Sequence, residues 1–165
     1  MRDYINYIVI FFFIQTSALG QSHVDSDFIK TKGTWLFPVD KIVKIDTMGP
    51  CYYPCDLPRG LTIETDSNRI VRSVQPGQVA IVTFIGDAYA VIVRNNDYFI
   101  TYSGLKSTLH KKGDYIKAGQ EIGILAGDND SFYELELFLS YGDKEDHRIQ
   151  DWFSEDFRRK ARFGK

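Results

Sequence analysis

The chain lacks a strong excess of charge of either sign. Its 165 residues include 20 lysines and arginines against 22 aspartates and glutamates, which gives a net charge of −2. This balance argues against a nucleic-acid binder that depends on net basicity, so we expect no nucleic-acid partner. A hydrophobic content of 44% and an aromatic content of 15% indicate an ordinary globular protein and argue against disorder.

Long apolar runs are also missing, except at the N-terminus. There Arg2 precedes the run from Tyr4 to Ile14, and small residues follow at Ala18 and Gly20. The run is shorter than the roughly 20 apolar residues that a membrane-spanning helix needs. The pattern predicts a secretory signal peptide that is cleaved near Gln21. We therefore expect an exported protein (in the periplasm, the cell envelope or the extracellular space) with no stable membrane anchor after cleavage.

Cysteine is scarce, with only Cys51 and Cys55, in the sequence CYYPC. In an exported protein an isolated pair of cysteines most often forms a disulfide. The competing interpretation is half of a metal site, which would need two further ligands nearby, and no other cysteine exists. We therefore predict a disulfide between Cys51 and Cys55.

Most of the remaining chain consists of short apolar segments separated by turn residues. The Asn-Asn-Asp sequence at 95–97 indicates a hairpin between two such segments. Gly77, Gly113 and Gly119 fall where tight turns would use a positive φ. No region alternates strand with helix, and only the C-terminal end could be helical. The pattern predicts an all-β fold, either a sandwich or a barrel.

Composition divides the chain into four parts. Residues 1–20 are the expected signal peptide, and the polar residues 21–33 are expected to form a flexible leader. Residues 34–152 hold the predicted strands and form the expected core domain. Residues 153–165 are rich in arginine and lysine, and we expect them to form a solvated, partly frayed tail.

Six segments occur in an order that resembles a known family. They are FPV at 37–39, RGLTIET at 59–65, IVRSVQPGQV at 70–79, YAVIVRNNDYFITYSGL at 89–105, LHKKGDYIKAGQEIGILAG at 109–127 and YELELFL at 133–139. Together they resemble the core domain of the LytM/lysostaphin-type zinc metallopeptidases, which cut peptide cross-links of bacterial cell walls. The resemblance implies an antiparallel β-sandwich of the duplicated hybrid motif, or barrel-sandwich, type.

The resemblance also implies where the active site would lie, and the expected residues are missing there. The family holds zinc with an H-x-x-x-D motif and one histidine of an H-x-H motif, and a further histidine in Y-x-H-L assists. Matched residue by residue, these positions hold Pro58 and Thr62, Glu134 and Glu136, and Gly104. A catalytic zinc site needs three protein ligands, and two carboxylates suit calcium better than zinc. The resemblance therefore implies a degenerate member without zinc, any other cofactor or catalytic residues.

Three functional hypotheses follow. The first is an inactive, exported peptidase-like domain that binds peptidoglycan or regulates a cell-wall hydrolase such as an amidase. Its binding groove would include Tyr102, Glu134 and Glu136, since tyrosine suits the binding of sugars and peptides. The second is an active cell-wall metalloendopeptidase with relocated ligands, in which His110 or His147 would converge with the two glutamates.

The third hypothesis is a carrier domain of the biotinyl or lipoyl type, which shares the G-D-x-V-x-x-G-Q pattern. Such a domain carries a modified lysine at the tip of a hairpin. The candidate lysines lie in other contexts, and export would separate the domain from the modifying ligases. These lysines are Lys106, Lys111, Lys112 and Lys117.

Overall fold

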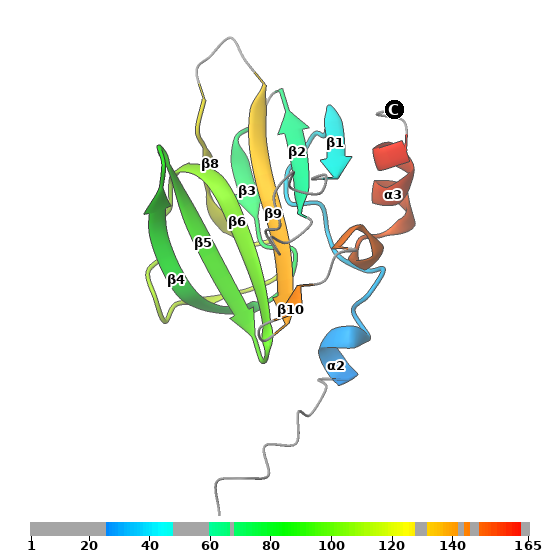
Figure 1. Ribbon diagram of the computed structural model, residues 1–165, viewed down its shortest axis with the longest axis horizontal. Coiled ribbons are helices and arrows are strands. Elements are labelled where there is room, and N and C mark those ends of the chain that lie inside the picture. Colours follow the sequence, from blue (N-terminus) through cyan, green and yellow to red (C-terminus); the bar gives the residue numbers. More distant parts are fainter. Residues whose placement is uncertain are drawn as a thin grey trace, which may run out of the picture.

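The strands of the protein form one extensive antiparallel system with short helices near the two ends of the described chain (Figure 1). The computed structural model describes residues 26–47, 60–66, 68–127, 132–141, 144–145 and 149–162. Among these residues every pairing between strands is antiparallel. The prediction of an all-β, antiparallel fold is confirmed.

The strands follow the turn signals of the sequence closely. Their bounds are β1 (Lys44–Thr47), β2 (Leu61–Thr65), β3 (Ile70–Arg72), β4 (Gly77–Ile85), β5 (Ala88–Asn95), β6 (Tyr98–Ser107), β7 (Tyr115–Ile116), β8 (Glu121–Leu125), β9 (Tyr133–Tyr141) and β10 (Lys144–Glu145). Two short helices, α2 (Ser26–Ile29) and the 3-10 helix η1 (Ile149–Trp152), and the longer α3 (Glu155–Arg162) complete the described elements.

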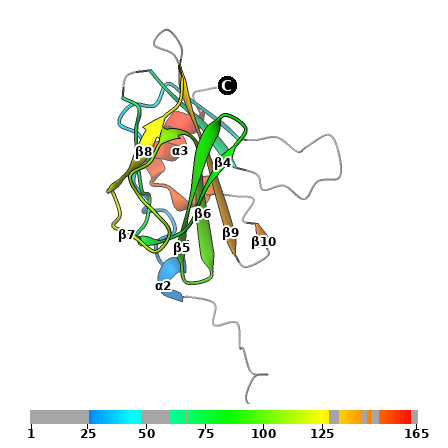
Figure 2. The ribbon, with the colours of Figure 1, turned by 90° about the vertical axis from the view of Figure 1, so that its left-hand side faces the viewer.

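The long strands lie in the order β1-β2-β9-β6-β5-β4-β7. Strand β8 pairs with the end of β6 and carries β3 on its other edge. Figure 2 shows β7 and β8 displaced to one side of the long strands β5, β6 and β9. The core fills the space between the long sheet and this second layer.

Alternation along β2 and β9 decides which side chains enter the core. Leu61 and Ile63 on β2, and Leu135 and Leu137 on β9, are fully buried. The residues between them therefore point to the opposite, outer face of the sheet, because successive side chains of a strand alternate. Glu134 and Glu136 belong to this outer face.

A cluster of aromatic side chains joins the two ends of the described chain. Phe28 of α2 stacks on Tyr98 with ring centroids 3.9 Å apart and lies 5.0 Å from the ring of Trp152. Trp35 packs against Trp152 and Phe153, and its backbone N–H donates to the carbonyl oxygen of Trp152. All five rings are at least nine-tenths buried. They close one end of the fold.

Two of the predicted boundaries are corrected by this cluster. The expected flexible leader included residues 26–33, but these are folded, and Phe28 is only 3% exposed. The expected frayed tail included Phe153 and Phe157, yet both are fully buried, with their rings stacked 3.9 Å apart. Burial of these large aromatic side chains removes apolar surface from water and stabilises the fold, so both segments belong to the domain.

The glycine predictions have a mixed outcome. Gly113 and Gly119 have φ angles of +96° and +75°, as expected for tight turns. Gly77 does not have a positive φ, so that expectation was wrong. Glycine is needed at this position because the neighbouring strand lies too close for a side chain. A Cβ at position 77 would lie 2.5 Å from the carbonyl oxygen of Arg94.

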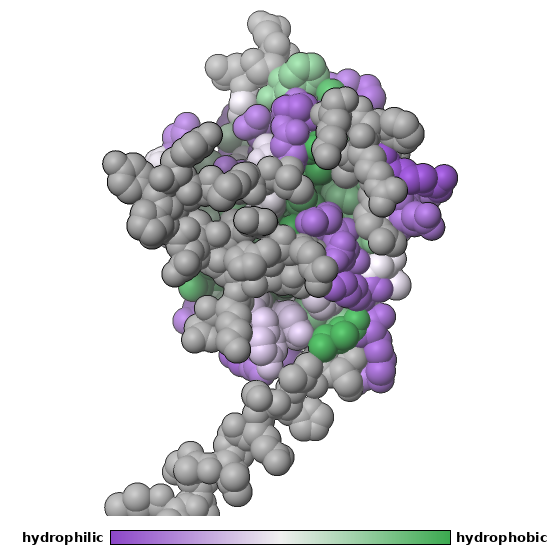
Figure 3. Space-filling view, turned by 45° about the vertical axis from the view of Figure 1, so that its right-hand side comes forward, coloured by the Kyte–Doolittle hydropathy of each residue, from purple (hydrophilic) through white to green (hydrophobic). Residues whose placement is uncertain are grey.

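Several predictions lie outside the described residues. These are the signal peptide, the disulfide between Cys51 and Cys55, and the positions of Pro58 and His147. Within the described part of the chain, no helix has the length and apolar character to cross a membrane. On the side that carries β1 and α3, hydrophilic residues predominate on the described surface, with small hydrophobic areas between them (Figure 3).

Candidate functional site

The strand register brings together the positions that the sequence singled out. Thr62 on β2 lies directly opposite Glu136 on β9, and Glu136 lies opposite Ser103 on β6. Glu134 lies opposite Glu64, one pair further along the same two strands. Opposite residues of an antiparallel pair point to the same face. The outer face of these strands therefore presents hydroxyl and carboxylate groups side by side.

We call the set Asp46, Thr62, Glu64, Glu134 and Glu136 the acidic face. Lys44 on the edge strand β1 lies against it and forms ion pairs with Asp46 and with Glu64, the latter at 3.4 Å between Nζ and Oε1. The hydrogen bond and negative charge of Asp46, followed by the charge of Glu64, raise the pKa of Lys44. Glu134 is exposed and Glu136 is half-buried.

Two features of the acidic face were missed in the sequence. Glu64 was not recognised, although the alternation in LTIET places Thr62 and Glu64 on the same face. The pairing of Glu64 with Glu134 could not have been read from the sequence, because it depends on the register between strands that are far apart in the chain. Like charges opposite each other are unfavourable, so a cationic group bound here would relieve their repulsion.

Gly104 lies in a β-bulge of β6. The pairing between β5 and β6 slips here, since Val91 pairs with Tyr102 but Tyr89 pairs with Leu105. The φ angle of Gly104 is +85°, and a Cβ at this position would lie 2.6 Å from the carbonyl oxygen of Glu134. Contacts this short between a Cβ and a backbone atom do not occur, so this backbone excludes any side chain. A histidine cannot replace Gly104 here without a shift of the strands.

The described donor atoms do not fit the zinc site that the resemblance implies. Thr62 supplies a hydroxyl, and Glu134 and Glu136 supply carboxylates, whereas catalytic zinc sites use three strong protein ligands that usually include histidine. Among the described residues, no three histidine, cysteine, aspartate or glutamate side chains converge as a metal site. We derive no zinc-dependent step for this face.

Tyr102 does not line the groove, so that prediction was wrong. Its side chain lies in the core, where it is fully buried, and its hydroxyl accepts a hydrogen bond from the N–H of Val74 at 2.9 Å. Burial raises the pKa of Tyr102 to about 12. The sequence did contain the signal, because Tyr98, Ile100 and Tyr102 are spaced two apart and share one face of β6.

His110 is held in the loop between β6 and β7. A nitrogen of its ring, Nε2, lies 2.8 Å from the carbonyl oxygen of Glu121, and Nδ1 lies 3.7 Å from a carboxylate oxygen of Asp114. Both ring nitrogens of His110 thus lie near groups of the adjacent segments, Glu121 and Asp114. They give no support to a relocated site in which His110 joins Glu134 and Glu136.

Comparison with protein families gives a match that covers most of the acidic face. The sequence profile of peptidase family M23 matches residues 57–144, which is more than half of the chain. No curated protein matches the sequence. The matched residues include β2 and β9, which carry all members of the acidic face except Asp46. The match favours the peptidase-like interpretation over the carrier domain.

Solved structures share the fold at low sequence identity. The structure of Csd3 from Helicobacter pylori in a hexagonal crystal has a TM-score of 0.56 and 15% identity over 78% of this chain and 38% of that one. A zinc-containing peptidase from Vibrio cholerae has a TM-score of 0.54 and 22% identity over 67% of this chain and 37% of that one. The chain thus spans less than two-fifths of either protein, and the likeness concerns the fold alone.

Proposed function

Because the chain belongs to peptidase family M23, we propose that it is an exported, catalytically inactive peptidase-like domain. Its acidic face takes the place of the active site and binds a cationic part of cell-wall peptide. A cell-wall hydrolase, such as an amidase, is the alternative partner for the same face. The domain works without zinc.

The backbone at Gly104 is the observation that carries this proposal. A φ of +85° and the short approach to the carbonyl oxygen of Glu134 leave no room for the assisting histidine of the family. The backbone conformation of β6 at Gly104, and not only the identity of the residue, is therefore incompatible with a histidine at this position. Thr62 and two glutamates stand at the other described positions, where the family has stronger zinc ligands, and this supports the proposal.

The same residues are well suited to binding. The carboxylates of Glu64 and Glu134 attract a positively charged group, and the hydroxyls of Thr62 and Ser103 can hydrogen-bond to polar atoms beside it. Because Glu134 is exposed, each contact is weak in water and is screened by salt. Binding should therefore be modest, and it should weaken as the ionic strength rises.

The experiment is co-sedimentation of the purified protein with isolated peptidoglycan. We expect wild-type protein to sediment with the wall and to release no soluble fragments. The double variant Glu134→Gln and Glu136→Gln should sediment several-fold less, because it removes two charges and leaves the shape of the face unchanged. The variant Glu121→Gln, which removes an exposed charge on β8, is the matched control and should behave as wild type.

Three results would change the proposal. Release of wall fragments that is lost in the double variant would establish an active hydrolase with relocated ligands. Capture of a purified amidase without any binding to the wall would make the regulatory partner the correct one. If wild type and the double variant bind neither the wall nor an amidase, the acidic face has no role in binding.

Export is tested separately. We expect the mass of the chain recovered from outside the cytoplasm to correspond to a protein that begins near Gln21. Recovery of the full-length chain in the cytoplasm would contradict this part of the proposal.

A further inference from the structure

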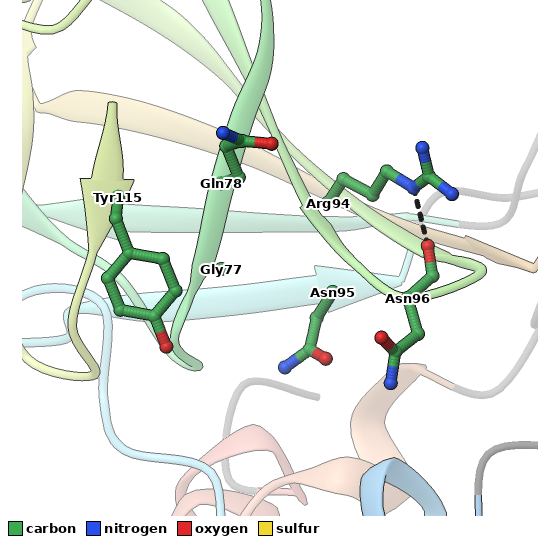
Figure 4. A pocket seen from close by; sticks show the side chains of 6 residues that line it. All are labelled: Gly77, Gln78, Arg94, Asn95, Asn96 and Tyr115. Atoms are coloured by element: carbon green, nitrogen blue, oxygen red, sulfur yellow. Dashed lines mark hydrogen bonds between the residues drawn. The ribbon is translucent and has the colours of Figure 1, made fainter. Parts of the chain in front are cut away.

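An open pocket lies where β4 begins and β5 ends. Its volume is about 510 Å³, which is in the range of small-molecule sites. The lining residues are Gly77, Gln78, Arg94, Asn95, Asn96 and Tyr115. Figure 4 shows Gly77 between Tyr115 on one side and Arg94 and Asn96 on the other. None of these residues belongs to the acidic face.

The register sets the width of the pocket. Gln78 lies opposite Tyr115 on one neighbouring strand and opposite Arg94 on the other. Opposite residues of antiparallel strands point to the same face, so Tyr115 and Arg94 flank Gln78 on one face of the sheet. Adjacent strands are about 4.8 Å apart, so the strands that carry Tyr115 and Arg94 are about 10 Å apart. A ligand of one or two amino-acid or sugar residues can span this separation.

Arg94 provides an oriented positive charge. Its Nε donates to the carbonyl oxygen of Asn96 at 2.6 Å, and its guanidinium carbon lies 5.8 Å from the centre of the Phe99 ring. Its two outer nitrogens have no partner among the described residues. A guanidinium held in this way can donate two parallel hydrogen bonds to a carboxylate.

Two side-chain amides are also held in place. Asn95 donates from Nδ2 to the carbonyl oxygen of Pro76 at 2.9 Å, and Gln78 donates from Nε2 to that of Gly113 at 3.0 Å. These hydrogen bonds determine which end of each amide is nitrogen. The amide oxygen of Gln78, which lies on the same face as Arg94, has no partner among the described residues, so it can accept an N–H group from a ligand.

Tyr115 supplies an apolar surface. Its side chain is 66% exposed, in contrast to the buried rings of the aromatic cluster around Trp152. A tyrosine ring offers a flat face to a methyl group or a sugar ring, with a hydroxyl at its edge. The pocket thus combines a cation, hydrogen-bond acceptors and a flat apolar wall.

We propose that this pocket binds a small organic carboxylate that also carries an amide N–H. Arg94 holds the carboxylate, the amide oxygen of Gln78 accepts the N–H, and Tyr115 covers the apolar part. Two sources share this chemistry, namely the C-terminal end of a peptide and an N-acetylated sugar acid. The site is independent of the acidic face and of the function proposed for it.

The test is an NMR titration of the ¹⁵N-labelled protein with four probes. They are N-acetyl-alanyl-alanine, its C-terminal amide, N-acetylmuramic acid and N-acetylglucosamine. We expect backbone signals of Gln78, Arg94 and Tyr115 to shift with the two acids. Each acid should bind about tenfold more tightly than its uncharged counterpart, because the contact with arginine is charge-assisted. The acid that binds more tightly identifies the source.

Variants connect the binding to the pocket. Arg94→Gln should lose the preference for the acids, Arg94→Lys should retain part of it, and Tyr115→Ala should weaken both acids several-fold. The matched controls Lys106→Gln and Tyr89→Ala change an exposed cation and a partly exposed tyrosine outside the pocket, and they should bind as wild type does. Unshifted signals from β2 and β9 will show that each variant remains folded.

The outcomes that would overturn the proposal are specific. They are equal affinity for an acid and its uncharged counterpart, unchanged affinity in Arg94→Gln, or no shift with either acid at the limit of its solubility. The double variant Glu134→Gln and Glu136→Gln separates the two sites, since it should lose wall binding and keep binding of the acids. Loss of acid binding in that variant, with Arg94→Gln unaffected, would contradict a separate pocket.

Discussion

Two single residues, Tyr102 and Gly104, shape the part of β6 that borders the acidic face. Gly104 adopts a conformation that has no room for a side chain, and Tyr102, two positions earlier, points to the opposite face of the sheet. The bulge between them keeps Leu105 in the core while it leaves Ser103 on the outer face. The conformation of one residue therefore decides which groups the face can present.

Substitution at Gly104 should be more costly than at a glycine with a similar φ and open surroundings. We expect Gly104→Ala to lower the free energy of unfolding by about 2–3 kcal/mol, because it combines an unfavourable φ with a backbone clash. Gly86 has a φ of +63° and no atom near its Cβ position, so Gly86→Ala should cost only about 1 kcal/mol. Urea denaturation measures both, and equal costs would contradict the clash.

Tyr102 should affect stability in a pH-dependent way. Loss of its hydroxyl in Tyr102→Phe leaves the buried N–H of Val74 without a partner, which should cost about 1–3 kcal/mol at neutral pH. Burial raises the pKa of Tyr102 from 10.0 to about 12. The unfolded chain therefore loses this proton first, and the wild type loses stability as the pH rises from 10 through 12.

That contribution is absent in Tyr102→Phe, so the stability difference between the two proteins should narrow over the same range. Denaturation at pH 8 and pH 11 measures it. The exposed Tyr115→Phe is the control and should match wild type at both pH values. A gap between wild type and Tyr102→Phe that widens with pH would contradict the assigned burial of the hydroxyl.

At the scale of elements, the segments outside the sheet are part of the fold. Helix α3 places Phe157 against Phe153 and against Phe37, at ring distances of 3.9 and 5.4 Å. Trp35 and Phe153 form a bridge between the two ends of the described chain. The terminal elements therefore stabilise the domain by covering apolar surface that the sheet alone leaves open.

Truncation of Phe157 tests this role. We expect Phe157→Ala to reduce the free energy of unfolding by about 3–5 kcal/mol, because it leaves a cavity in a fully buried aromatic stack. Glu155→Gln, in the exposed first turn of the same helix, should change it by less than about 0.5 kcal/mol. Thermal unfolding of both variants provides the measurement. A Phe157→Ala protein as stable as wild type would restore the interpretation of a frayed tail.

At the scale of the whole molecule, two chemically different regions lie at separate places on one β fold. The acidic face gathers negative charge from β1, β2 and β9, and the pocket at the start of β4 has a single cation in a polar lining. The fold of peptidase family M23 thus presents two chemically distinct surfaces in this chain, and their functions must be argued from their residues and not from the fold.

Zinc binding distinguishes a degenerate site from a relocated one. We expect no stoichiometric zinc in the purified protein after incubation with excess metal and removal of free ions, since tight sites need several strong donors held together. Metal analysis provides the measurement. In a parallel assay the protein should release no soluble fragments from peptidoglycan. One zinc per chain, with binding lost in Glu134→Gln or Glu136→Gln, would contradict this expectation.

Local sequence alone determined much of this protein. The turn residues and the short apolar segments predicted the β class and the positions of β2 to β9, because chain reversal and alternation depend on neighbouring residues. The resemblance to the peptidase family, matched residue by residue, also implied that Thr62, Gly104, Glu134 and Glu136 were the positions of interest. In the structure these four residues lie on the neighbouring strands β2, β9 and β6, as the resemblance implied.

Only the tertiary structure decided how these residues face and what surrounds them. The inward direction of Tyr102, the bulge at Gly104, the pairing of Glu64 with Glu134 and the burial of Phe28 and Phe157 depend on contacts between distant segments. A local sequence pattern predicts that successive side chains of a strand alternate between the two faces of the sheet. It does not predict which of the two faces other elements will cover. The second layer that holds β3 and β8 covers this face of the sheet, and segments from both ends of the described chain close the fold beside it; the burial of their apolar surface decides which face becomes the core.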